Sequence, residues 1–96
     1  MTLIEFKSSL HAKEGPNDVG PLLLALWNDA KGNWSEAHTI VQEIDHPDGA
    51  WIHAYLHRKE GDDANAKFWY DMAGKKFTTK PLPEEWEEIV SHFLNS

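Results

Sequence analysis

The most constraining feature of the 96-residue chain is an internal repeat. Segment 25–37 aligns with segment 54–66, and Gly32 aligns with Gly61, which stands 29 positions later. Alanines recur at the same spacing, at positions 25 and 54 and again at positions 37 and 66. Repeats of about 20–50 residues are typical of folds that copy one supersecondary unit. The repeat therefore predicts two copies of a helix–turn–helix unit.

Apolar residues recur at helical spacing through most of the chain, and no segment alternates in the way that strands do. The pattern predicts an N-terminal helix and loop over 1–20, helical hairpins over 21–44 and 50–74, and a last helix over 83–95. These segments are expected to form a single domain over 1–96. We therefore expect an all-α fold of five to six helices, in which the last helix acts as a C-terminal cap.

Proline, glycine and capping residues predict the helix ends. Pro21 and Pro83 suit the first positions of helices. Asn33, followed three residues later by Glu36, resembles a capping box, and Asp62 is expected to cap the helix that follows Gly61.

One further boundary is expected between the two hairpins. The His-Pro-Asp-Gly sequence at 46–49 predicts a turn that closes the preceding helix near Ile44. The next helix is then expected to run from Ala50 to Glu60.

Each unit of the repeat resembles a tetratricopeptide repeat. The first unit carries the pattern at Gly32, Asn33, Trp34, Ala37, Val41 and Ile44. The second carries it at Gly61, Asp62, Ala66, Tyr70 and Ala73, with Asp63 in place of the aromatic residue. The family repeat has about 34 residues, so this one is shorter. The resemblance implies a short right-handed array of helices, with both of its open ends covered by the flanking segments.

The segment 49–62, Gly-Ala-Trp-Ile-His-Ala-Tyr-Leu-His-Arg-Lys-Glu-Gly-Asp, also resembles a set of small uncharacterised bacterial proteins. The shared pattern runs from Gly32 to Gly74. This resemblance implies a common fold and brings no activity with it.

In tetratricopeptide domains the first helix of each unit lines a concave face. Carried over to this chain, that face would present the side chains of Leu22, Leu26, Trp51, Tyr55, Arg58 and Lys59. An aromatic floor with one arginine is suited to a peptide carboxylate or a small anion. The alternative is that Trp51 and Tyr55 pack under the N-terminal segment as part of the core.

His53 and His57 stand four residues apart, a spacing with which a helix presents two imidazoles to one metal ion. His38 or Glu60 could supply a third ligand. The simpler interpretation is a pair of partly buried, hydrogen-bonded histidines, so we expect no metal and no cofactor. A small metal- or histidine-dependent enzyme that uses His38, His53, His57 and Glu60 is kept as an alternative.

Composition and motifs narrow the classes of function and partner that remain. The net charge of −7 disfavours nucleic acid and anionic membrane surfaces as partners, and there is no cysteine. The chain shows no nucleophile elbow and no glycine-rich phosphate loop. We therefore expect a cytoplasmic, non-catalytic binding or adaptor module, with Trp51, Tyr55, Arg58, His53 and His57 as its candidate ligand-binding residues. A structural homodimer is a third hypothesis, because the sequence leaves the oligomeric state open.

Overall fold

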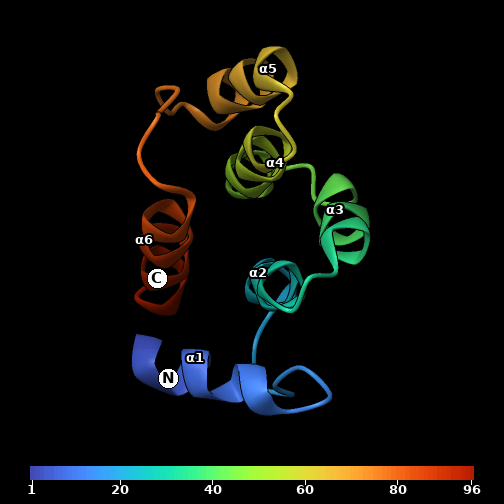
Figure 1. The fold of residues 1–96 in the computed structure, drawn as a ribbon, viewed down its shortest axis with the longest axis vertical. Helices are drawn as coiled ribbons and strands as arrows, with labels where there is room; N and C mark the ends of the chain where they lie inside the picture. Colours follow the sequence, from blue (N-terminus) through green and yellow to red (C-terminus); the bar gives the residue numbers. More distant parts are fainter.

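The computed structural model describes all 96 residues and contains helices but no strands. The elements are α1 (Leu3–Ser8), a short 3₁₀ turn (Ser9–His11), α2 (Pro21–Ala30), α3 (Trp34–Gln42), α4 (Pro47–Lys59), α5 (Asp63–Ala73) and α6 (Leu82–Leu94) (Figure 1). The prediction of an all-α fold of five to six helices is confirmed, and the number is six. None of the helices combines the length and apolar character needed to cross a membrane.

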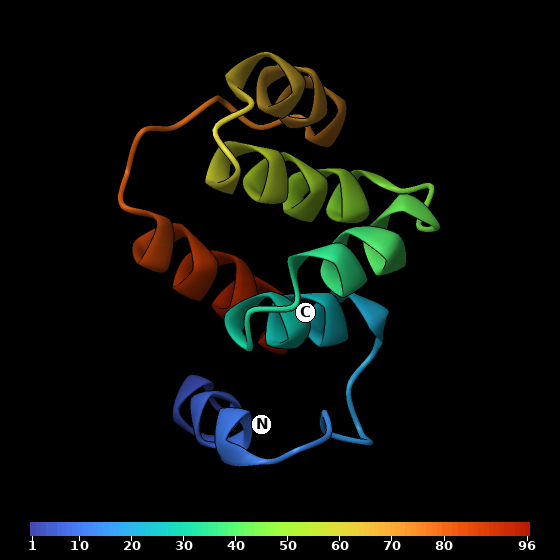
Figure 2. The same ribbon diagram turned by 45° about the vertical axis from the view of Figure 1, so that its right-hand side comes forward.

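The helices pack in the order of the chain, and the last one returns to the first ones. α2 packs on α3, α3 on α4, and α4 on α5. α6 then lies against α2 and α4, and α1 packs on α6. Figures 1 and 2 show α2 to α5 following one another, with α6 brought back by the extended segment after α5. One hydrophobic core connects all these helices, because it includes Phe6 of α1, Tyr70 of α5 and Trp86 of α6.

The repeated alanines lie where helices meet. All four of them are completely buried: Ala25, Ala37, Ala54 and Ala66. A methyl side chain lets two helix backbones approach closely, which larger side chains prevent. The sequence repeat thus places a small, completely buried residue on each helix of the α2–α3 and α4–α5 pairs.

The two turns of the repeat share one backbone conformation. Gly32 has φ 87° and Gly61 has φ 85°, both in the left-handed region that favours glycine. After each glycine, the next amide donates to a carbonyl five residues earlier: Asn33 N to Asn28 O at 2.8 Å, and Asp62 N to His57 O at 2.9 Å. These bonds satisfy carbonyls that the ends of α2 and α4 leave free.

The expected turn at 46–49 is wrong, because α4 begins at Pro47 rather than at Ala50. Pro47 takes the first helical position, and Nδ1 of His46 accepts a hydrogen bond from the amide of Asp48 at 3.0 Å. The turn sequence therefore initiates a helix. Gly49 is required for another reason, since a Cβ at this position would lie 2.9 Å from the carbonyl oxygen of Ile44.

The other predicted helix ends are partly corrected. Asp62 caps α5 by accepting a hydrogen bond from the amide of Asn65 at 3.2 Å, as expected. Asn33 precedes α3 but makes no capping hydrogen bond with its side chain. The α3 helix ends at Gln42, and α6 begins at Leu82 rather than at Pro83.

Candidate functional site

The aromatic residues expected on an open concave face lie in the interior. Trp51 is 5% exposed and Tyr55 is 2% exposed. The ring of Trp51 meets the rings of His92 and Phe93 edge-on, at centroid distances of 5.4 and 6.0 Å. Helix α6 therefore covers the surface that a peptide would need, and the N-terminal segment does not provide this cover.

Arg58 is engaged within the same interface. Its Nε and Nη2 donate to Oε1 of Glu85 at 3.1 and 2.9 Å, and the hydroxyl of Tyr70 donates to Oε2 of the same carboxylate at 2.7 Å. Glu85 is 2% exposed, and burial together with its carboxylate raises the pKa of Tyr70. A buried carboxylate needs such partners, because an unpaired buried charge is strongly unfavourable. This contact joins α4, α5 and α6 and engages Nε and Nη2 of Arg58, whose side chain is only 10% exposed.

The sequence alone did not single out Glu85, which stands among the glutamates at positions 84, 85, 87 and 88. The available signal is its position four residues before Ile89, on the apolar side of the last helix. Ile89 is completely buried, so Glu85 enters the core from the same side.

The three histidines named from the sequence come together between α3 and α4. Nε2 of His38 lies 3.0 Å from Nε2 of His53. The rings of His53 and His57 stack at a centroid distance of 4.9 Å, and the ring of His38 stands edge-on to both. One ring nitrogen from each histidine lies within 4.8 Å of one from each of the others. His53 and His57 are buried, and His38 is half-buried.

Two tryptophans close this histidine cluster, defined as His38, His53 and His57. Trp34 stacks on the ring of His38, with the two planes 11° apart, and its Nε1 donates to the carbonyl of Leu56 at 2.9 Å. Trp69 of α5 stacks on the ring of His53 at a centroid distance of 3.9 Å. The stacking restricts how the imidazoles can turn, because their flat faces are held by fixed indole rings.

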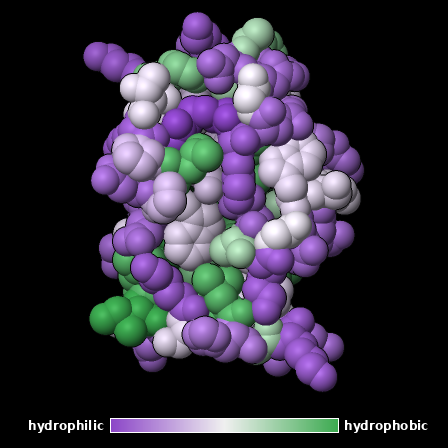
Figure 3. All heavy atoms as spheres, in the orientation of Figure 1, coloured by the Kyte–Doolittle hydropathy of each residue, from purple (hydrophilic) through white to green (hydrophobic).

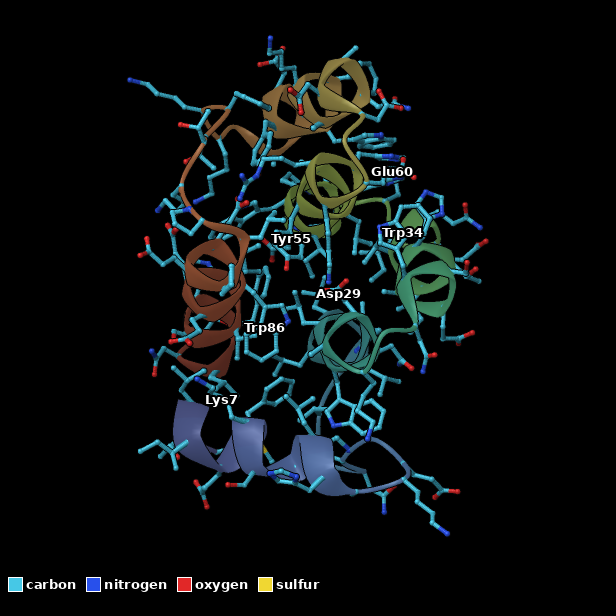
Figure 4. All side chains as sticks on the ribbon, in the orientation of Figure 1. Lys7, Asp29, Trp34, Tyr55, Glu60 and Trp86 are labelled. Carbon is cyan, nitrogen blue, oxygen red and sulfur yellow. The ribbon has the colours of Figure 1, made fainter.

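Glu60 orients the third histidine. Its Oε1 lies 2.7 Å from Nδ1 of His57, so Nδ1 donates its proton to the carboxylate and Nε2 keeps a free lone pair. Figure 4 shows Trp34 and Glu60 on the same side of the molecule, beside the end of α4. A carboxylate on the far nitrogen of an imidazole is the usual second partner of a metal-binding histidine. Glu60 and Asp62 also form a second close group with His57.

The surroundings of His38 and His53 favour neutral rings. Burial, together with smaller effects of the neighbouring His38 and His57, lowers the pKa of His53 to about 4. Burial and the charge of His57 also lower the pKa of His38. Metal ions bind only deprotonated imidazole nitrogens, so a site that keeps the rings neutral presents lone pairs at neutral pH.

A small hollow of about 290 Å³ lies next to the histidine cluster. The rings of His53 and Trp69 form part of its wall, and Met72 borders it from α5. The hollow gives His53 contact with an open space, although only 6% of the residue is exposed.

Two opposite roles are open to His53 and His57. Burial with bonds to backbone or tryptophan favours a structural role, and convergent polar groups favour a site. The structure combines burial with polar groups that converge, since the partners are another histidine and a carboxylate. The simple structural pair is therefore an incomplete description of these residues.

Comparisons of the chain with protein-family models, with curated proteins and with solved structures find no match. The two resemblances seen in the sequence thus identify no family, and the functional argument depends on the geometry of the side chains.

Proposed function

We propose that this protein binds a divalent transition-metal ion, preferably zinc, through His38, His53 and His57. The observation that carries the proposal is the convergence of three imidazole nitrogens from two helices to within 4.8 Å of one another. This proposal replaces the expectation that the chain binds no metal.

The geometry is close to what zinc requires. Zinc binds imidazole nitrogens at about 2.0–2.1 Å, so two ligands of a tetrahedral site lie about 3.3 Å apart. His38 and His53 already have their Nε2 atoms 3.0 Å apart. The third nitrogen lies within 4.8 Å of the other two, so the imidazoles would have to turn to bring it to the ion, and the metal would then replace the hydrogen bond between His38 and His53.

The ligand set favours zinc over hard cations and leaves one position open. Imidazole suits zinc, copper and nickel, whereas magnesium and calcium prefer oxygen ligands. Three histidines occupy three positions of a tetrahedron, and a water molecule or an outer ligand takes the fourth. Metal sites with one open position are typical of catalytic zinc, so the metal-dependent enzyme is retained as an extension of this proposal.

The direct test is metal uptake by the purified protein. We expect native mass spectrometry and calorimetry to show one zinc ion per chain. We expect His53→Ala to lose this uptake, while His11→Ala, which removes an exposed histidine far from the cluster, leaves it unchanged. Glu60→Gln should weaken binding by about tenfold to a hundredfold, because it removes the carboxylate that orients the metal-binding His57. Uptake that is absent in the wild type, or equal in the wild type and His53→Ala, overturns the proposal.

We also propose that α2–α3 and α4–α5 are two units of a right-handed, tetratricopeptide-like array. The matched turns at Gly32 and Gly61 and the buried alanines support this arrangement. In such an array α6 lies where a peptide ligand binds in longer members of the family. An adaptor function would then use an outer face of the array. Because Trp51 is buried, a pull-down with Trp51→Ala would report mainly on the stability of the fold.

The homodimer remains a separate hypothesis, supported by exposed apolar side chains. Phe68 and Met72 on α5 are 53% and 56% exposed, and Met1 and Ile4 are exposed at the other end. Figure 3 shows one face on which hydrophilic residues dominate and hydrophobic ones gather toward the α1 end. Two separated patches give no single large interface. Light scattering that yields the mass of two chains would support the dimer, and the mass of one chain would exclude it at the concentration used.

A further inference from the structure

A second hollow, bordered by α2, α4 and α6, lies beside a buried oxygen that has no hydrogen-bond partner. This atom is Oδ2 of Asp29, and it is the one such side-chain atom in the protein. Buried polar atoms are nearly always paired, because an unpaired one costs about 1–3 kcal/mol. The exception therefore indicates a place for a donor that comes from outside the chain.

The position of Asp29 strengthens this argument. Asp29 is in the last turn of α2, where the helix dipole disfavours a negative charge. Its other oxygen, Oδ1, accepts a hydrogen bond from Nζ of Lys59 at 2.9 Å. The side chain is 1% exposed, whereas that of Lys59 is 38% exposed. The carboxylate is thus fixed and buried, while its partner is a flexible cation that reaches solvent.

The hollow offers space and aromatic walls next to this carboxylate. It has a volume of about 460 Å³, and its wall includes Lys7, Asp29, Tyr55, Lys59, Trp86 and Glu87. Figure 4 shows Asp29 and Tyr55 in the space between α2 and α4, with Trp86 reaching toward it from α6. The indole of Trp86 is held in place, because its Nε1 donates to the carbonyl of Leu26 at 3.0 Å.

The neighbouring hydroxyl does not satisfy the free oxygen. Burial and the Asp29 carboxylate raise the pKa of the Tyr55 phenol, which shows that the two groups are close. A hydrogen bond between this hydroxyl and the Asp29 carboxylate contributes to that shift, but Oδ2 itself has no hydrogen-bond partner. A ligand that carries a positive donor would fill this gap better than a neutral hydroxyl does.

We infer that this hollow binds an α-amino acid with an apolar side chain. The ammonium group of the ligand would donate to the carboxylate of Asp29, and its side chain would lie against the rings of Tyr55 and Trp86. Because Oδ2 is covered, Lys59 must swing aside to admit the ligand. The ammonium of Lys59 then stays within reach of the ligand's carboxylate. The ion pair between Lys59 and Asp29 is thus replaced by two ion pairs, one between Asp29 and the ligand and one between the ligand and Lys59.

This assignment explains why both signs of charge border one small space. The carboxylate of Asp29 would repel a simple anion. A simple cation would be repelled by Lys59 and Lys7 and could not form an ion pair with either of them. A zwitterion pairs with both signs. The site shares no residue with the histidine cluster, so it does not depend on the proposed metal.

The first test uses three compounds of one shape on the wild-type protein: L-leucine, isoamylamine and 4-methylpentanoate. The last two carry only the ammonium or only the carboxylate. Binding is followed by amide and indole cross-peaks in ¹H–¹⁵N spectra up to roughly 10 mM ligand, a range that detects weak affinities. We expect L-leucine to bind most tightly, isoamylamine to bind less tightly and 4-methylpentanoate not to bind. We expect the shifts to centre on Ala30, Tyr55, Lys59 and the Trp86 indole.

The second test uses variants. Asp29→Asn keeps the shape but removes the charge, and we expect it to weaken L-leucine binding by about tenfold or more. Lys7→Met removes a rim cation and is expected to weaken binding less. Lys80→Met is the matched control, because Lys80 forms a similar exposed pair with Glu88 outside the hollow, and it should change nothing.

Three results would overturn the inference. They are the absence of binding by L-leucine, shifts that lie away from the hollow, and an Asp29→Asn protein that is folded and binds L-leucine as the wild type does. The comparison of the three compounds does not require a variant, so it decides the ligand class even if Asp29→Asn fails to fold.

Discussion

Nε2 of His38 on α3 lies 3.0 Å from Nε2 of His53 on α4. One ring must donate a proton to the other, so the pair is stable only while at least one imidazole is neutral. His57 stacks beside them, and Glu60 holds its Nδ1. This relationship joins the two helical hairpins and places the candidate metal ligands side by side.

Acid should destabilise the metal-free protein through this contact. The pKa of His53 is lowered to about 4 in the folded chain, whereas an unfolded histidine has a pKa of about 6.5. Between these values the unfolded state binds more protons, so stability is lost as the pH falls. We expect the free energy of unfolding to drop by about 1–2 kcal/mol between pH 7 and pH 5. His38, His57 and Glu60 lie around the His53 imidazole, so they also contribute to the measured change in unfolding free energy.

Urea denaturation at several pH values measures this dependence. His53→Gln should flatten the curve between pH 7 and pH 5, whereas His11→Ala should keep the wild-type slope. An unchanged slope in His53→Gln would contradict the assignment of the acid sensitivity to this residue.

Zinc should stabilise the folded chain. A ligand that binds only the folded state adds about 2.7 kcal/mol when its free concentration is a hundred times its dissociation constant. We expect zinc to raise the melting temperature of the wild type and to leave that of His38→Ala unchanged. Calorimetric melting with and without a chelator measures the effect, and an equal rise in both proteins would contradict binding at the cluster.

Loss of Glu85 should be far more harmful than loss of its neighbour in the sequence. Glu85→Ala leaves the half-buried Arg58 without its partner, and breaking a pair whose carboxylate is buried costs up to about 3–5 kcal/mol. Glu85→Gln keeps an acceptor and should cost less. Glu87→Ala removes an exposed pair with Lys7 and should cost about 0–1 kcal/mol. Equal losses for Glu85→Ala and Glu87→Ala in urea denaturation would rule out the buried contact as a main support of α6.

The two repeat turns should respond alike to substitution. No atom lies within 4 Å of a Cβ added at Gly32 or at Gly61, so the cost of alanine there comes from the left-handed backbone alone. We expect each alanine variant to lose about 1–2 kcal/mol of unfolding free energy. The asparagine variants should lose less, because asparagine tolerates the left-handed conformation better. Thermal unfolding of the four single variants measures this, and a large difference between the two positions would show that the turns are not equivalent.

Sequence reasoning was most successful where the interactions are local. Helix spacing, the Asp62 cap and the glycine turns depend on residues a few positions apart, and each agrees with the structure. The turn at 46–49 failed because proline and glycine also occur inside the first turn of a helix. The contact of Gly49 with Ile44 is a packing effect that composition does not reveal.

The candidate site was half visible in the sequence. His53 and His57 share a side of one helix, and their spacing alone shows this. The position of His38 depends on how α3 packs on α4, and the stacking of Trp69 depends on how α5 packs on α4. These contacts connect residues on different helices, so periodicity within one helix cannot reveal them.

By itself, the sequence determined the helices, the repeat and the close alanine contacts, because each follows from local spacing and residue size. Only the tertiary structure decided which faces stay open. Helix α6 returns over Trp51 and Arg58, brings Glu85 into the core and leaves a hollow beside Asp29. The physical reason is that a helix with one apolar side must bury it, and several surfaces can accept it. The packing of the whole chain selects one of them.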